Sequence, residues 1–264
     1  MVYTDLDGTL LGPGGSLFAA PGGVVEPRAA QALAALGEAG VAVIPVSGRT
    51  AANVWEMARL VGSADYIAEM GGIVGLDRDA EQIRAFGAYR GGTTPYREMA
   101  ESGAAGLLLD AHRGRLEPHA PWAFLPRECS MLFRGKVDTE AARSMLAEAG
   151  SGWLDLLDNG VIPRAFPGLD VDEVHAYHLL PRGVTKAEGA RIHRERRGLA
   201  PEECIAIGDA PSDAALATQV GAVFIVENGR GAVEAAGNIA ENVFVTEGSH
   251  GAGFAEAVAA AGLG

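Results

Sequence analysis

Cysteine is nearly absent from this sequence, which has only Cys129 and Cys204 among its 264 residues. The two lie 75 positions apart and form no C-x-x-C pair. Neither a disulfide framework nor a cysteine-ligated zinc site is therefore expected. We interpret both residues as buried thiols of a protein in a reducing cytosol.

Positive charge is also scarce, because 21 basic residues face 34 acidic ones and the formal net charge is -13. A chain of this charge has no global field that attracts nucleic acid or an anionic membrane surface. Of the basic residues 19 are arginine, and only Lys136 and Lys186 are lysine. Any recognition of phosphate must therefore be local.

Long apolar runs are missing too. Val41–Val46 and Ala255–Ala261 fall well short of the roughly 20 residues that a membrane span needs. Met1 leads directly into a short strand and acidic residues, without the basic and apolar regions of a signal peptide. We expect a cytoplasmic protein with no membrane or nucleic-acid partner, and nothing in the sequence indicates an oligomeric state.

Short β-branched runs alternate with longer Ala/Leu-rich segments at both ends of the chain, a pattern typical of βαβ units around a parallel sheet. The strands predicted there are Val2–Thr4, Val41–Val46, Tyr66–Ala68, Cys204–Ile207, Ala222–Val226 and Val243–Val245. Helices are predicted at Pro27–Ala39, at Ala51–Leu60, from Thr185 to about Arg197, and from Pro211 onward.

The middle of the chain has a different pattern: from about Glu81 to Arg182 the apolar segments are less regularly spaced and prolines are frequent. Strands are predicted there at Cys129–Arg134, Trp153–Leu157 and Val174–Leu180, with a helix at Thr139–Ala149. The sequence therefore predicts an α/β core of residues 1–80 and 183–264, into which an α+β domain of residues 81–182 is inserted.

The segment Asp5-Leu6-Asp7-Gly8-Thr9 follows the first predicted strand. Side chains two apart on an extended segment point the same way, so the carboxylates of Asp5 and Asp7 can share one site. Two carboxylates that close repel each other unless a cation or a proton intervenes, which indicates a divalent metal. Gly8 allows a tight turn whose N–H groups can hold phosphate oxygens.

Two other interpretations apply to this segment. Asp and Gly are ordinary surface-turn residues, so a plain turn stays open. A calcium-binding EF-hand that began at Asp5 would need Gly at position 10 and Glu at position 16, where the chain has Leu10 and Ser16. The EF-hand interpretation fails.

Gly208-Asp209-Ala210-Pro211-Ser212-Asp213 follows another predicted strand. The carboxyl ends of parallel strands line the crevice where open α/β sheets bind ligands, so Asp209 can converge with Asp5 and Asp7. Such a group of carboxylates suits Mg²⁺, which also takes water and substrate phosphate as ligands. A helix cap by Asp209 is the alternative, and the two roles are compatible.

Two weaker motifs remain. Ser47-Gly48-Arg49-Thr50 precedes a predicted helix, whose N-terminus can bind an anion, although a serine there is usually only the cap. Lys186 lies in the first turn of its helix, where a cation opposes the helix dipole. A lysine in a chain that otherwise uses arginine indicates a need for a compact charge, or else a solvated surface residue.

Taken together and in this order, these motifs resemble those of the haloacid dehalogenase (HAD) superfamily. Asp5-x-Asp7-x-Thr9 resembles its first motif, Ser47 its second, Lys186 its third, and Gly208-Asp209 with Asp213 its fourth. An insertion between the second and third motifs is similar to the C2 cap of the IIB or Cof-type branch. That branch includes sucrose-phosphate phosphatase and mannosyl-3-phosphoglycerate phosphatase.

The resemblance implies a Rossmann-like core with a parallel sheet, a C2-type cap and a phosphatase reaction. In such an enzyme Asp5 attacks phosphorus and becomes an aspartyl-phosphate, and Asp7 is the general acid and base. It implies Mg²⁺ as cofactor, with Asp5, Asp7, Asp209 and Asp213 as metal-site residues, and phosphate binding by Gly8, Thr9, Ser47, Gly48 and Lys186.

The partner implied by the resemblance is a small phosphorylated metabolite, either a sugar phosphate or a phosphoglycerate-type ester. Two alternatives stay open at the level of sequence. A phosphomutase would use the same residues and shield the phospho-aspartate from water. A binding or regulatory module would keep the fold and lack catalysis.

Overall fold

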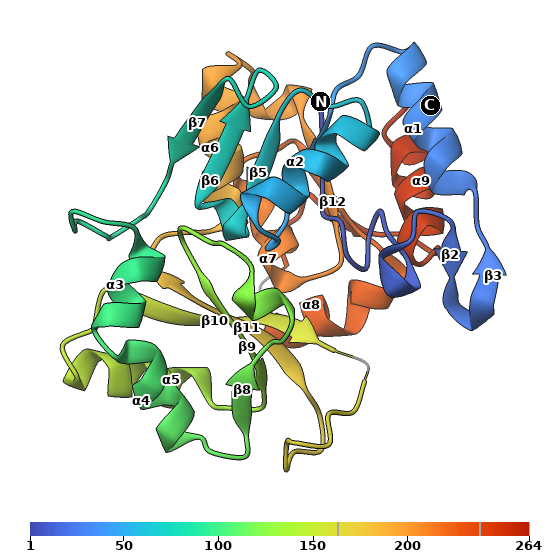
Figure 1. Cartoon of the computed structure of the whole chain (residues 1–264). Helices are drawn as coiled ribbons and strands as arrows, with labels where there is room; N and C mark the ends of the chain where they lie inside the picture. Colours follow the sequence, from blue (N-terminus) through green and yellow to red (C-terminus); the bar gives the residue numbers. More distant parts are fainter. Residues whose placement is uncertain (163, 238, 264) are drawn as a thin grey trace. The chain divides into compact units, whose positions relative to one another are not determined.

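The computed structural model describes residues 1–162, 164–237 and 239–263. The chain divides into two compact units, the first of Met1–Arg84 and Thr185–Gly264, the second of Ala85–Val184. The second unit is thus inserted, in sequence, between the halves of the first (Figure 1). The predicted domain boundaries, at residues 81 and 182, lie within four residues of these divisions.

A five-stranded sheet, in the order β14-β13-β12-β1-β4, forms the centre of the first unit. All of its neighbouring strands pair in parallel. The strands are β1 (Val2–Thr4), β4 (Val43–Pro45), β12 (Ile205–Gly208), β13 (Ala222–Ile225) and β14 (Val243–Val245). Each agrees with a predicted strand to within a few residues.

Helices pack against both faces of this sheet, because its strands carry apolar side chains on alternate positions of each face. They are α1 (Arg28–Glu38), α2 (Ala51–Leu60), α6 (Lys186–Arg196), α7 (Pro211–Ala214), α8 (Arg230–Ala236) and α9 (His250–Ala260). One apolar cluster joins Val2 to Leu36 of α1 and Phe254 of α9. Helices α1 and α9 lie side by side in Figure 1. The second joins Tyr3 and Ile44 to Ala190 of α6.

One predicted strand of the core lies in a different sheet. Tyr66–Ala68 forms β5, which pairs antiparallel with β6 (Ile73–Leu76), and β6 pairs antiparallel with β7 (Glu81–Arg84). An isolated parallel bridge, Val46 to Ile67, links β5 toward the five-stranded sheet. The hairpin forms because Gly75 lies opposite Tyr66, where a Cβ would come within 2.1 Å of the ring.

The second unit has a four-stranded antiparallel sheet in the order β10-β11-β9-β8. Its elements are α3 (Pro95–Glu101), α4 (Ala104–Ala111), β8 (Leu116–Pro118), β9 (Met131–Gly135), α5 (Thr139–Glu148), β10 (Leu154–Val161) and β11 (His175–Pro181). Phe133, Leu156 and Tyr177 on one face of the sheet pack with Leu108 and Leu146 of the helices. The predicted α/β core with a separate α+β module is confirmed.

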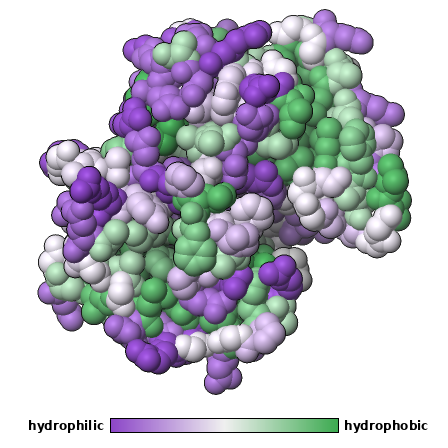
Figure 2. Space-filling view, viewed as in Figure 1, coloured by the Kyte–Doolittle hydropathy of each residue, from purple (hydrophilic) through white to green (hydrophobic). Residues whose placement is uncertain are grey.

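A short hairpin of β2 (Ala19–Ala20) and β3 (Val24–Val25) precedes α1. Phe18, Val24 and Val25 are all at least half exposed there. Figure 2 shows apolar side chains gathered over α1 and this hairpin. Within the described residues, no helix combines the length and the apolar composition needed to cross a membrane.

Candidate active site

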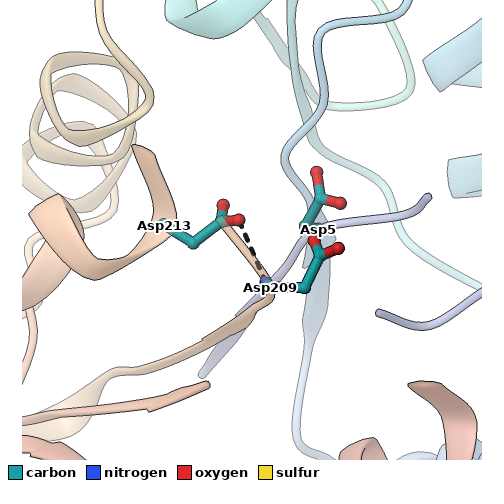
Figure 3. A group of neighbouring side chains, drawn as sticks. All are labelled: Asp5, Asp209 and Asp213. Carbon is teal, nitrogen blue, oxygen red and sulfur yellow. Dashed lines mark hydrogen bonds between the residues drawn. The ribbon is translucent and has the colours of Figure 1, made fainter. Parts of the chain in front are cut away.

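The carboxylates of Asp5, Asp209 and Asp213 meet at one edge of the five-stranded sheet (Figure 3). Asp5 directly follows β1, and Asp209 directly follows the neighbouring strand β12. Asp213 lies in α7, the short helix after Asp209. One oxygen from each carboxylate lies within 4.8 Å of the others, with Asp5 and Asp213 buried and Asp209 partly buried.

Lys186 joins this group from α6. Its Nζ donates to Oδ1 of Asp5 at 2.7 Å and to Oδ1 of Asp213 at 2.8 Å, and its side chain is only 2% exposed. The helix begins here because the Thr185 hydroxyl accepts a hydrogen bond from the Glu188 N–H. The capping motif predicted from the sequence thus fixes the position of the buried lysine.

Negative charge exceeds positive charge in this group. When all three carboxylates are ionised they face one ammonium, which leaves two negative charges unbalanced. Burial, together with the charges of Asp213 and Asp209, raises the pKa of Asp5 well above its usual range despite Lys186. Burial and the charge of Asp213 likewise raise the pKa of Asp209 to about 7.

Lys186 itself stays protonated. Burial alone would lower its pKa, but the charges of Asp213 and Asp5 outweigh that effect and raise the pKa far above the ordinary value. The group thus combines a permanent cation with carboxylates whose ionisation is costly. This is the electrostatic environment that a divalent cation would relieve.

The donor set fits a hard cation such as Mg²⁺. Asp213 has both of its oxygens engaged, since Oδ1 accepts from Lys186 and Oδ2 accepts from the N–H groups of Asp209 and Ala210. Asp5 and Asp209 are therefore the carboxylates best suited to bind the ion directly. Asp213 orients Lys186 and the turn that carries Asp209.

Asp7 lies differently from the sequence-based expectation. The chain turns at Leu6, and the Asp7 carboxylate does not join the group of three among the described residues. Instead it forms a two-bond ion pair with Arg49, whose Nε lies 2.7 Å from Oδ2 and whose Nη2 lies 2.5 Å from Oδ1. Its side chain is 55% exposed, so solvent reaches it.

Gly8 and Thr9 both contact Asp209. Gly8 has a positive φ of 88°, and a Cβ on it would lie 2.1 Å from Oδ2 of Asp209. Only glycine therefore permits this approach. The Thr9 hydroxyl donates to Oδ1 of Asp209 at 3.1 Å.

The segment with Ser47 and Gly48 follows β4, the other neighbour of β1. Ser47 is buried, and its Oγ accepts from the N–H of Arg49 at 3.2 Å. The residue that caps α2 is Thr50, whose Oγ1 accepts from the N–H of Asn53. The helix-cap explanation of Ser47 therefore does not apply, and its hydroxyl lies at the edge where β1 and β4 end.

Two further residues of the site had no role assigned from the sequence, Arg49 and Asn228. Nδ2 of Asn228 donates to the Gly8 carbonyl at 2.9 Å and lies 3.5 Å from Oδ2 of Asp209. Asn228 comes three residues after the end of β13, the strand beside β12. This position after a parallel strand is the sequence signal that could have indicated a site residue, because other site residues also follow parallel strands.

Comparisons with known proteins identify the family that this chain resembles. The family model described as haloacid dehalogenase-like hydrolase matches residues 171–256. The phosphoglycolate phosphatase of Methanothrix thermoacetophila is 28% identical over 257 residues, or 97% of this chain and 94% of the relative. That of Methanopyrus kandleri is 28% identical over 230 residues, or 84% and 81%.

The fold has close counterparts among solved structures. The sucrose-phosphatase of Synechocystis superposes with a TM-score of 0.68 at 14% identity, over 99% of this chain and 97% of that one. The matched segment and the shared fold both support the predicted haloacid dehalogenase-like superfamily. The two curated relatives are phosphatases, which agrees with the enzyme class predicted from the sequence.

Proposed function

We propose that this hydrolase is a Mg²⁺-dependent phosphatase that cleaves a small phosphate monoester through a phosphoryl group carried on Asp5. The observation that carries the proposal is the buried group of Asp5, Asp209, Asp213 and Lys186, with its two unbalanced negative charges. A buried nucleophile next to a fixed ammonium and a cation site is suited to transfer of an anionic phosphoryl group.

The first step forms one bond and breaks one. An oxygen of Asp5 attacks phosphorus, and the bond between phosphorus and the ester oxygen breaks. Asp7, once released from Arg49 and protonated by solvent, donates this proton to that leaving oxygen. Asp7 then takes a proton from water, which attacks the phosphorus of phospho-Asp5, releases inorganic phosphate and restores the carboxylate.

Other groups would stabilise the negative charge of the phosphoryl group during both steps. Mg²⁺ bound by Asp5 and Asp209, together with the main-chain carbonyl of Asp7, would neutralise charge on the transferring group. Asp213 would hold the Lys186 ammonium in place. The phosphoryl oxygens would be bound by Lys186, by the hydroxyls of Thr9 and Ser47, and by the N–H groups of Gly8 and Gly48.

The substrate class we propose is a small phosphorylated carboxylic acid of the phosphoglycolate type. Support comes from the Methanothrix thermoacetophila relative, a phosphoglycolate phosphatase that aligns with nearly the whole chain. Sugar phosphates are the comparison class, because the sucrose-phosphatase of Synechocystis shares the fold.

The test is phosphate release with and without metal. The purified chain should release inorganic phosphate from phosphoglycolate, lose that activity in EDTA and regain it with Mg²⁺. Asp5→Asn should abolish turnover and keep the circular dichroism spectrum, because the amide cannot attack phosphorus and changes the volume little. Metal-independent turnover, or full activity in a folded Asp5→Asn protein, would contradict the proposal. Absence of net phosphate release, with transfer to a second hydroxyl, would indicate a mutase.

A further inference from the structure

Helix α6 carries Lys186 but has little apolar surface with which to pack. Its buried residues are Lys186, Gly189, Ala190 and His193. Of these, only alanine contributes an apolar side chain, and that side chain is small. Ile192 is partly buried and also packs against the apolar cluster of Tyr3 and Ile44. Hydrophobic burial on this helix is therefore limited to two side chains.

Close backbone contact fixes the first half of the helix. A Cβ on Gly189 would lie 2.8 Å from Cα of Gly71, and a Cβ on Gly71 would lie 2.0 Å from the Thr185 carbonyl oxygen. These contacts bring α6 against the 3-10 helix Glu69–Gly71. These contacts set the distance between α6 and the 3-10 helix. However, the two glycines have no side chain that would prevent α6 from rotating about its axis or sliding along it.

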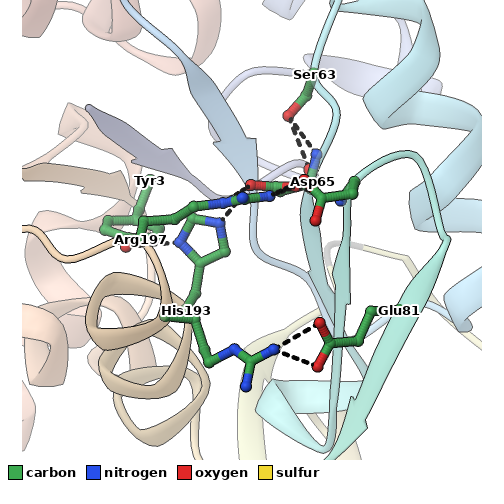
Figure 4. Close-up of polar contacts among 8 residues, drawn as sticks. Tyr3, Ser63, Asp65, Glu81, His193 and Arg197 are labelled. Carbon is green, nitrogen blue, oxygen red and sulfur yellow. Dashed lines mark hydrogen bonds and ion pairs between the residues drawn. The ribbon is translucent and has the colours of Figure 1, made fainter.

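A buried polar network fixes the second half (Figure 4). His193 has no exposed surface, with Nε2 2.9 Å from Oδ2 of Asp65 and Nδ1 2.9 Å from the Tyr3 hydroxyl. A carboxylate only accepts, so we assign the proton to Nε2 and let the Tyr3 hydroxyl donate to Nδ1. Arg197 donates to both oxygens of Asp65, at 2.8 Å and 2.5 Å.

Asp65 is ionised in this network. Burial alone would raise its pKa, but hydrogen bonds from His193 and Arg197 outweigh that effect and hold the pKa well below its usual range. A fully paired buried network of this kind has a single satisfied geometry, because any shift leaves a polar group without its partner.

The network connects the two elements that meet at the site. Tyr3 lies two residues before Asp5, and His193 follows Lys186 by seven residues, which is two helical turns or about 10 Å along the same face. The strand that leads to the nucleophile and the helix that carries the ammonium are therefore held together at a point remote from the reacting atoms.

We propose that Tyr3, His193 and Asp65 are positioning residues, which hold α6 against β1 so that Nζ of Lys186 meets the carboxylate of Asp5. The inference rests on the proposed function, because it assigns these residues to the phosphoryl-transfer step. None of them touches the Asp5 carboxylate, and their effect is transmitted through α6.

The most specific test of this role is the variant Tyr3→Phe, which removes one hydroxyl and leaves the buried ring in place. Its kcat for phosphoglycolate should fall by about 10- to 100-fold, the usual cost of a displacement of about 1 Å in a reacting group, while KM changes little. His193→Gln, which keeps a donor toward Asp65 and loses the acceptor for Tyr3, should behave in the same way.

Two controls separate positioning from general loss of stability. Arg191→Ala changes the same helix on its outer side, where Arg191 pairs with Glu188 and Glu195, and should leave kcat unchanged. Val258→Ala removes apolar packing from α9, on the other side of the sheet, and should lower the melting temperature without lowering kcat.

A double-mutant cycle gives the decisive readout. In a Lys186→Ala background, Tyr3→Phe should have almost no further effect on kcat, because there is no ammonium left to position. Full additivity of the two losses, or an unchanged kcat in Tyr3→Phe, would overturn the positioning role and leave the proposed function standing. A wild-type chain that releases phosphate from no ester would instead overturn the proposed function.

Discussion

The two units each contain one lysine, and they place it in opposite ways. Lys186 of the first unit is 2% exposed and contacts two buried carboxylates. Lys136 of the second unit has a side chain that is 38% exposed and pairs with Asp172, which is 82% exposed. Both ion pairs have a separation of 2.7–2.8 Å, so their geometry alone does not distinguish them.

Solvent makes the difference between the two lysines. An exposed ion pair contributes about 0–1 kcal/mol, because water screens it and holding the side chains costs entropy. Burying charges costs several kcal/mol per ion before their attraction is counted, so a buried group persists where geometry or function requires it. A lysine in a chain that otherwise uses arginine is thus informative only when its burial is known.

The contrast between exposed and buried charged groups is tested first at Asp7, the exposed carboxylate beside the buried group. Asp7→Asn should lower kcat/KM for phosphoglycolate by about 10²- to 10⁴-fold, because the alkoxide of glycolate is a poor leaving group that needs a proton. For p-nitrophenyl phosphate, whose phenolate leaves readily, the loss should be much smaller. Steady-state kinetics with both esters measure this, and equal losses would assign Asp7 to metal binding or geometry.

The lysines themselves give the second test. Lys186→Ala should lower kcat/KM by about 10²-fold or more, since it removes a preorganised charged donor. Lys186→Arg should restore only part of that activity, because the planar guanidinium places its donors differently. Circular dichroism of each variant checks that the fold is kept.

Lys136→Ala is the matched control. It removes the exposed lysine of the second unit and should change kcat/KM at most through substrate preference, with a stability change of about 0.5 kcal/mol or less. A nearly silent Lys186→Ala, with loss of all turnover in Lys136→Ala, would reverse the roles that burial assigns to the two residues.

The smallest predicted effect concerns stability at Asp209. Its pKa is raised to about 7, mainly by burial and then by the charge of Asp213. Ionising it therefore destabilises the folded state, and this loss develops as the pH rises from the usual carboxyl range toward 7. Without metal at pH 8, Asp209→Asn should melt higher, by about 2–4 °C for each kcal/mol regained.

Magnesium should reduce or reverse this difference in melting temperature between Asp209→Asn and the wild type. It should raise the melting temperature of the wild type, because an ion that binds only the folded state stabilises it, and should have little effect on Asp209→Asn. Thermal unfolding in EDTA and in Mg²⁺ measures both changes. An equal Mg²⁺ effect on the two proteins would exclude Asp209 as a ligand.

The sequence predicted those features that neighbouring residues determine. The five strands of the parallel sheet and the start of α6 at Thr185 follow from local apolar runs and a local cap. Asp5 and Asp209 could be assigned to one edge because residues that follow adjacent parallel strands converge there. These predictions needed no knowledge of side-chain packing.

Features that depend on partners distant in the chain could not be predicted. β5 was assigned to the parallel sheet because its composition does not show that it forms an antiparallel hairpin with β6 through Gly75. The pairing of Asp7 with Arg49, and that of Asp65 with His193, join residues 42 and 128 positions apart. No local pattern encodes them, since tertiary packing decides which charged groups meet.

The most direct test of the central claim, that Asp5 carries the phosphoryl group, is to trap it there. The wild-type chain, mixed with Mg²⁺ and phosphoglycolate and quenched with acid within its first turnovers, should yield a peptide phosphorylated at Asp5 by mass spectrometry. The same mixture with Asp5→Asn should yield none. Rapid phosphate release by the wild type with the label on another residue, or with an equal label in Asp5→Asn, would contradict the account.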